Sequence, residues 1–158
     1  MTADTLALDK ILVPVDFSRT SELALEHGQR LVELFGSVLH LLHVVECPHI
    51  GPAGAALWGY SLPAVVDRLE AGARERMAGL AAGLDSDRAV QREARVGEPF
   101  VEIVRYAHER DIDLIVMGTH GRGAVAHMLL GSVAENVLRT APCPVMTVRD
   151  AGHAFVMP

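Results

Sequence analysis

The most constraining feature of this chain is the alternation of short apolar runs with segments of helical periodicity. Each run is too short for a buried helix and suits a strand that is covered on both faces. Apolar runs of this kind lie at Lys10–Asp16, Ser37–Val45, Asp113–Gly118 and Pro144–Val148, and Val90–Val96 is a weaker, charge-bearing strand candidate.

Helical signals occupy the intervals between these runs. Ser18 is placed to cap a helix that carries leucines at helical spacing, and Gly36 is placed to close it. Pro99 suits the first turn of a later helix. The remaining intervals predict a long loop at Glu46–Pro63. They also predict helices at Leu62–Leu84, Pro99 to about Arg110, and Ser132–Thr140.

Strands that alternate with helices predict an α/β fold, an open five-stranded parallel sheet with helices on both faces. We expect a single domain over residues 1–158, with a core of about residues 9–149. Such a sheet binds ligands beyond the carboxyl ends of its strands, where the strand order reverses. If the first and fourth strands are neighbours there, Asp16 and the loop after Gly118 face each other across one cleft.

Composition excludes several classes of function. The chain of 158 residues has a formal net charge of −6, which argues against a non-specific nucleic-acid binder. No apolar run approaches the length that spans a bilayer, and the first residues lack the pattern of a signal peptide. We therefore expect a cytoplasmic protein without a membrane partner, in which Cys47 and Cys143 are free thiols.

The glycine-rich segment Gly118–Ser132 offers chemistry for binding an anion. Glycine lets a bulky anion approach the main chain, and a helix start presents free N–H groups with a partial positive charge. Phosphates would be held here by backbone N–H groups, the Ser132 hydroxyl, and either Arg122 or a divalent cation. The alternative is structural: turn glycines at Gly118 and Gly131, with Ser132 as an N-cap.

Other nucleotide motifs do not fit this segment. The spacing Gly121-x-Gly123-x-x-Ala126 matches a dinucleotide fingerprint, but that fingerprint belongs to the first strand–helix turn of a fold. A Walker A motif is absent, and Lys10, the single lysine, precedes the first strand. The histidines form neither HxH nor HExxH, so we predict no structural metal site.

The form Gly-x2-Gly-x9-Gly-Ser, filled by Gly118, Gly121, Gly131 and Ser132, resembles the ATP-binding signature of the universal stress protein family. The likeness spans about residues 9–149. Further segments that resemble the family are Ile11–Ser18, Leu41–Glu46, Asp113–Gly118 and Ala141–Val145.

This resemblance implies a Rossmann-like fold of the adenine nucleotide alpha hydrolase type, and a role for each matching residue. Asp16 and the main chain of Val44 would hold adenine. An ionised carboxylate can only accept hydrogen bonds, which suits an adenine amino group or a ribose hydroxyl. The other implied roles are lining the base and ribose pocket (Pro14, Val15, Met117), approaching the ribose and phosphates (Gly118, Gly121), and holding the phosphates (Gly131, Ser132, Val133).

Some residues keep a second interpretation. Asp16 could instead be a carboxylate at the helix start that accepts from nearby N–H groups. His120 is included among the nucleotide-binding residues, although solvent exposure is the simpler interpretation for it and for His127. His40 and His43 suit strand positions packed under helices. The charged residues of Leu62–Leu84 suit a solvated helix face.

The predicted function is an ATP-binding stress or regulatory protein with slow hydrolysis at most, its phosphates accompanied by Mg²⁺ or Mn²⁺. Catalysis would need an electrostatic clamp and a base, and we find no triad spacing and no paired carboxylates near the loop. The alternatives are a weak ATPase or adenylyl-transfer enzyme, and an interaction module that does not depend on nucleotide. The edge strand Pro144–Val148 and the family resemblance both indicate a homodimer.

Overall fold

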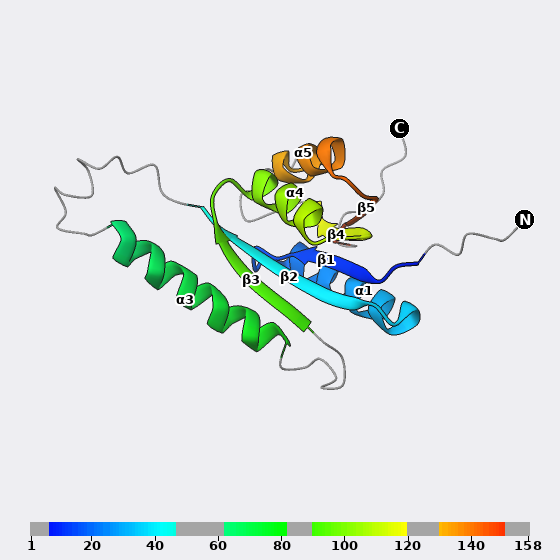
Figure 1. Cartoon of the computed structure of the whole chain (residues 1–158), viewed down its shortest axis with the longest axis horizontal. Coiled ribbons are helices and arrows are strands. Elements are labelled where there is room, and N and C mark those ends of the chain that lie inside the picture. The colour runs from blue at the N-terminus through cyan, green and yellow to red at the C-terminus, as the bar shows by residue number, and fades with distance from the viewer. Residues whose placement is uncertain (1–6, 47–61, 82–89, 120–129, 151–158) are drawn as a thin grey trace, which may run out of the picture.

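The computed structural model describes residues 7–46, 62–81, 90–119 and 130–150. Its elements follow one another in the predicted alternation of strands and helices (Figure 1). In chain order they are β1 (Lys10–Pro14), α1 (Arg19–Phe35), β2 (Val38–Val45), α3 (Leu62–Ala81), β3 (Val90–Val96), α4 (Pro99–Glu109), β4 (Leu114–Gly118), α5 (Ser132–Thr140) and β5 (Val145–Val148).

The strands form one parallel sheet in the order β3-β2-β1-β4-β5, which confirms the predicted α/β fold. The chain runs outward from β1 to β3, then crosses to β4 on the other side of β1. The order therefore reverses between β1 and β4, which pair through Ile11 with Leu114 and Leu12 with Ile115. This is the switch point at which such sheets bind ligands.

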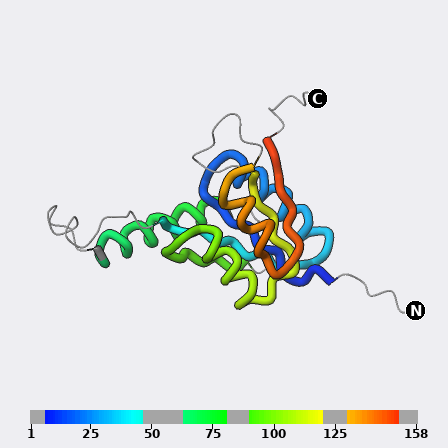
Figure 2. Tube along the Cα trace, turned by 90° about the horizontal axis from the view of Figure 1, so that it is seen from above, coloured from blue at the N-terminus to red at the C-terminus, as the bar shows by residue number. Residues whose placement is uncertain are grey.

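Each face of the sheet is covered by a separate pair of helices. Ile11 and Val13 of β1 pack with the buried residues of α1 and α3, whereas Leu12 packs on the opposite face with α4 and α5. Successive strand side chains point to opposite faces, so one short strand supplies both cores. Figure 2 shows α1 and α4 on opposite sides of the strands.

The start and end of α1 follow the sequence signals. Ser18 is the N-cap and its side chain accepts from the N–H of Ser21, while Gly36 has φ 75° and donates its N–H to Val32. Inside the helix, a Cβ at Gly28 would lie 2.6 Å from Cγ2 of Val13, so glycine is what allows α1 to approach β1. Both caps are confirmed.

Some predicted boundaries differ from the structure. The first strand ends at Pro14 and not at Asp16, which lies in the turn that follows and accepts from the helix start. The described part of α3 ends at Ala81, and most of the predicted loop Glu46–Pro63 lies outside the described residues. Among the helices of the described ranges, none is long and apolar enough to cross a membrane.

Candidate functional site

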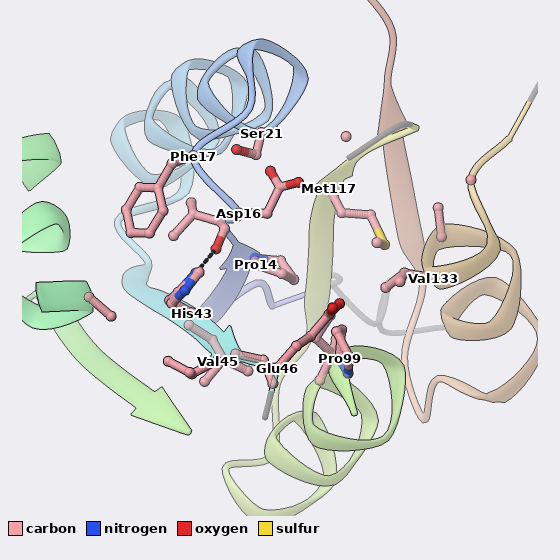
Figure 3. A pocket seen from close by; sticks show the side chains of 18 of the residues that line it. Pro14, Asp16, Phe17, Ser21, His43, Val45, Glu46, Pro99, Met117 and Val133 are labelled. Atoms are coloured by element: carbon pink, nitrogen blue, oxygen red, sulfur yellow. Dashed lines mark hydrogen bonds between the residues drawn. The ribbon is translucent and has the colours of Figure 1, made fainter. Parts of the chain in front are cut away.

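A cavity of about 780 Å³ opens at the carboxyl ends of β1, β2 and β4 (Figure 3). The starts of α4 and α5 and one face of α3 complete its walls. All the predicted site residues that the structure describes line this single cavity: Pro14, Val15, Asp16, Val44, Met117, Gly118, Gly131, Ser132 and Val133. The remaining two, His120 and Gly121, lie outside the described residues, as does His127.

Asp16 lies in the turn between β1 and α1, at the centre of the cavity wall (Figure 3). Its Oδ1 accepts from the backbone N–H of Ser18 at 3.0 Å and from the Ser18 hydroxyl at 2.6 Å. Through Oδ1, Asp16 is therefore a carboxylate at the helix start that accepts from a nearby N–H group, which was the second interpretation of this residue. These two bonds also fix the carboxyl group in place at the cavity wall.

The start of α5 forms the opposite wall, and here the predicted cap is wrong. Gly131 is the N-cap and makes no side-chain capping bond, while Ser132 is the first helical residue and its side chain is exposed. The first N–H groups of a helix have no intrahelical partner, and within the described residues no side-chain cap occupies them, which suits an anion. The Gly131 N–H itself donates to the carbonyl of Thr119 at 2.7 Å, which joins the two ends of the intervening loop.

Gly118 has a packing role beside any role toward a ligand. A Cβ on this residue would lie 2.9 Å from the carbonyl carbon of Thr20, so a side chain would collide with the first turn of α1. Gly131, in contrast, has φ −72° and ψ 152°, which other residues adopt readily. The packing therefore requires glycine at Gly118, whereas the backbone conformation at Gly131 does not require one.

Sequence reasoning missed three side chains that lie together beside Asp16. The rings of Phe17 and His43 are 4.5 Å apart, and the Arg76 guanidinium carbon lies 3.8 Å from the Phe17 ring centroid. The His43 Nδ1–H donates to the carbonyl of Val15 at 2.6 Å. Arg76 was predicted to lie on a solvated helix face; it is exposed, but it also lines the cavity.

A spacing signal for Arg76 was present in the sequence. Leu69, Gly72, Ala73 and Arg76 follow the i, i+3, i+4, i+7 pattern of one helix face, and all four line the cavity. Of the described lining residues, Arg76 is the only arginine or lysine, whereas Asp16 and Glu46 are acidic. Among its described lining residues, the cavity therefore has little fixed positive charge.

His40 differs from His43 although both lie on β2. Its Nδ1 is 2.9 Å from the Tyr106 hydroxyl in the core under α4. Burial lowers the pKa of His40, and the positive charges of Lys10 and Arg110 lower it further. Cys143 is a free thiol whose pKa is raised by burial, and Cys47 lies outside the described residues.

Within the described ranges, no group of His, Cys, Asp and Glu side chains is arranged to hold a metal ion.

Comparison with known proteins identifies close relatives. The family model described as "Universal stress protein family" matches residues 7–149. The chain is 34% identical over 152 residues to Universal stress protein MJ0577 of Methanocaldococcus jannaschii, covering 89% of this chain and 94% of the relative. It is 34% identical over 146 residues to Universal stress protein A homolog 2 of Coxiella burnetii, covering 90% and 96%.

Solved structures of other proteins are similar to this chain in fold. The structure of MJ0577 matches with a TM-score of 0.80 at 33% identity, over 91% of this chain and 97% of that one. A universal stress protein in complex with cAMP matches with a TM-score of 0.60 at 26% identity, over 90% and 97%. With its parallel sheet, its cavity at the switch point and these matches, the chain belongs to the universal stress protein family.

Proposed function

We propose that this protein binds an adenine nucleotide, foremost ATP, between the end of β1 and the start of α5. One observation carries the proposal: a single cavity has a fixed carboxylate, Asp16, in one wall and a helix start without a side-chain cap at the other. The first suits the donors of a base or ribose, and the second suits phosphates.

In this arrangement the base end is formed by Asp16 and the main chain of Val44, and the phosphate end by the start of α5. The N–H groups of Ser132 and Val133 and the Ser132 hydroxyl donate to phosphate oxygens. The other residues take the roles that the family resemblance implies. The base and ribose are lined by Pro14, Val15 and Met117, and the ribose and phosphates are approached by Gly118 and Gly121. Gly131 contacts the phosphates, and His120 contacts the nucleotide from the loop.

The charges of the cavity support a nucleotide that arrives with its own cation. Asp16 and Glu46 outnumber Arg76 among the described charged lining residues, so a polyphosphate gains little from fixed protein charge. Mg²⁺ or Mn²⁺ on the phosphates would offset that deficit. The relative solved with cAMP supports the ligand class.

We further propose that the protein holds ATP with little or no hydrolysis. Phosphoryl transfer depends on an electrostatic clamp and a group that orients the attacking water. Among the described lining residues, Asp16 could orient a water and Arg76 could act as the clamp. Asp16, however, accepts from Ser18 through Oδ1, and the Arg76 guanidinium lies over the Phe17 ring. A turnover above about 1 s⁻¹, the usual range for enzymes, would instead establish an ATPase.

The test is calorimetric titration of Mg-ATP into wild type, Ser132→Ala and Thr140→Val. We expect Ser132→Ala to weaken ATP binding about tenfold, because it removes a hydrogen bond to a charged group. Thr140 is the matched control: its hydroxyl lies at the other end of the same helix and donates to the carbonyl of Asn136. Absence of any heat or thermal shift with wild type, and no adenine nucleotide released on denaturation, would refute the proposal.

We also propose a cytoplasmic homodimer that pairs through Pro144–Val148. β5 is the edge strand next to β4, and Met146 is 37% exposed there. An apolar edge favours pairing with a second copy. Sedimentation at micromolar concentration should show a dimer; a monomer would contradict this.

A further inference from the structure

The turn that carries Asp16 has an unusual backbone. Phe17, between Asp16 and Ser18, has φ 62°, in the left-handed region that bulky residues rarely adopt. Such conformations persist only where the surroundings hold them, and they concentrate at functional sites. The contacts of this turn therefore show what keeps the Asp16 carboxyl group in position.

Three consecutive residues of the turn are held by three different elements. β2 holds Val15, whose N–H donates to Leu42 at 2.8 Å and whose carbonyl accepts from His43. The start of α1 holds Asp16 through Ser18. The Phe17 ring lies against His43, and α3 reaches it through Arg76.

Arg76 differs from its neighbour Arg74 on the same helix. Arg74 pairs with Glu70 at 2.6 Å, one turn earlier in α3. Arg76 has no carboxylate partner within the described ranges, and its guanidinium lies over the Phe17 ring. A guanidinium over an aromatic face is an attractive contact that also covers the ring.

We infer that Arg76 is a positioning residue for the nucleotide site: by covering Phe17, it keeps the Val15–Phe17 turn in the conformation that presents Asp16 to the base. Arg76 acts through Phe17 and contacts no phosphate. The inference rests on the proposed function, since it assigns the base end of that site. It adds α3 to the elements that determine nucleotide affinity.

A ligand series separates this role from direct phosphate binding. Adenosine, AMP and Mg-ATP are titrated into wild type, Arg76→Met, Arg76→Lys and Arg74→Met. Losing a cation–π contact at a partly exposed site corresponds to about a two- to fivefold loss in affinity. We expect Arg76→Met to weaken all three ligands by the same factor in this range, Arg76→Lys to recover most of it, and Arg74→Met to match wild type.

Two results would overturn the inference: a loss confined to the phosphorylated ligands, which would make Arg76 a phosphate ligand, or no loss for any ligand.

If wild type binds none of the three ligands, the proposed function fails. The positioning role is then decided by NMR, because the Phe17 ring shifts the resonances of the adjacent His43 ring. Arg76→Met should move the His43 ring protons while Arg74→Met leaves them in place; unchanged shifts in Arg76→Met would refute the role.

Discussion

The two ends of the same parallel strands are built differently. At the amino end, Oδ2 of Asp113 accepts from the N–H groups of Asp9 and Lys10 at 2.9 and 2.8 Å. The Lys10 ammonium donates to the carbonyl of Arg110 at 2.7 Å. This end is closed by the protein's own donors and acceptors.

At the carboxyl end the same strands open into the cavity. There the backbone is left-handed at Phe17, and α5 starts without a side-chain cap. Groups that are satisfied within the protein contribute to stability, whereas groups left to a ligand contribute to binding. Changes at the amino end should therefore lower stability alone, and changes at the carboxyl end should lower affinity more than stability.

The largest exception to that division is expected at Gly118. Gly118→Val should lower the free energy of unfolding by about 3 kcal/mol, since the new side chain meets the backbone of Thr20 rather than a movable side chain. Urea unfolding measures this. Gly72→Ala is the control, because a Cβ there meets nothing within 4 Å beyond the neighbouring backbone of its own helix, and replacing a helix-interior glycine should add about 0.5–1 kcal/mol.

Asp113→Ala should show the stability effect of the amino end. It leaves two backbone N–H groups without their carboxylate acceptor, which should lower the free energy of unfolding by about 2 kcal/mol. Calorimetric affinity for Mg-ATP should match wild type. A loss of affinity comparable to the loss of stability would show that the two ends are coupled.

Asp16→Ala is the counterpart at the carboxyl end. We expect affinity for Mg-ATP to fall about tenfold, equivalent to about 1.4 kcal/mol of binding free energy. The free energy of unfolding should fall by only about 1 kcal/mol, because Ser18 remains as the N-cap of α1. If stability falls and affinity does not, Asp16 is only a structural residue of the helix start.

The sequence allowed the fold to be predicted because strand and helix signals agreed locally. Apolar runs indicated every strand except the charge-bearing β3, and Ser18 and Gly36 marked the limits of α1. The predicted site residues met in one cavity because neighbouring parallel strands end at the same edge. That argument needs only strand ends and their order.

The rest depended on contacts between segments distant in sequence. Nothing in the sequence near Gly118 indicates that Thr20 occupies the space that a side chain at position 118 would need. Arg76 is 59 residues from Phe17 along the chain, and its helix spacing could not show which ring it would meet. The N-cap of α5 was misplaced by one residue because a serine is the usual cap and glycine a weaker one.

His40 should make stability depend on pH. Its pKa is lowered by burial, so below about pH 6.5 the unfolded chain binds a proton that the native state does not. The free energy of unfolding should therefore fall as pH drops below about 6.5, by at most about 1.4 kcal/mol per pH unit. Thermal or urea unfolding between pH 7.5 and pH 5 covers about this range.

His40→Asn keeps a polar group near Tyr106 but cannot titrate, so its pH dependence should be flatter than that of wild type. The exposed His27 supplies the matched control for replacing an imidazole by an amide, as His27→Asn. Equal slopes in all three proteins would assign the pH dependence to other groups.

The smallest expected effect is a change in ATP affinity on removing one negative charge, compared between the carboxyl and the amino end of the strands. Glu135 lies in the first turn of α5, is exposed, and pairs with Arg139 at 3.4 Å. Glu135→Gln removes a negative charge beside the proposed phosphate site and should raise affinity for Mg-ATP about twofold at low salt. The exposed Glu33, near the end of α1 at the amino side of the sheet, carries the same charge far from the cavity.

Glu33→Gln should change affinity far less, because Glu33 lies near the far end of the 17-residue α1, roughly 20 Å from the cavity, and the Coulomb interaction weakens with distance. The Glu135→Gln gain should disappear at about 1 M salt, where the Debye length is about 3 Å. Equal gains in both variants would mean that the ligand responds to net charge alone, and the start of α5 would lose its assignment as the phosphate site. A gain in Glu135→Gln alone places the phosphates at that helix start by a measurement that leaves every lining residue of the cavity intact.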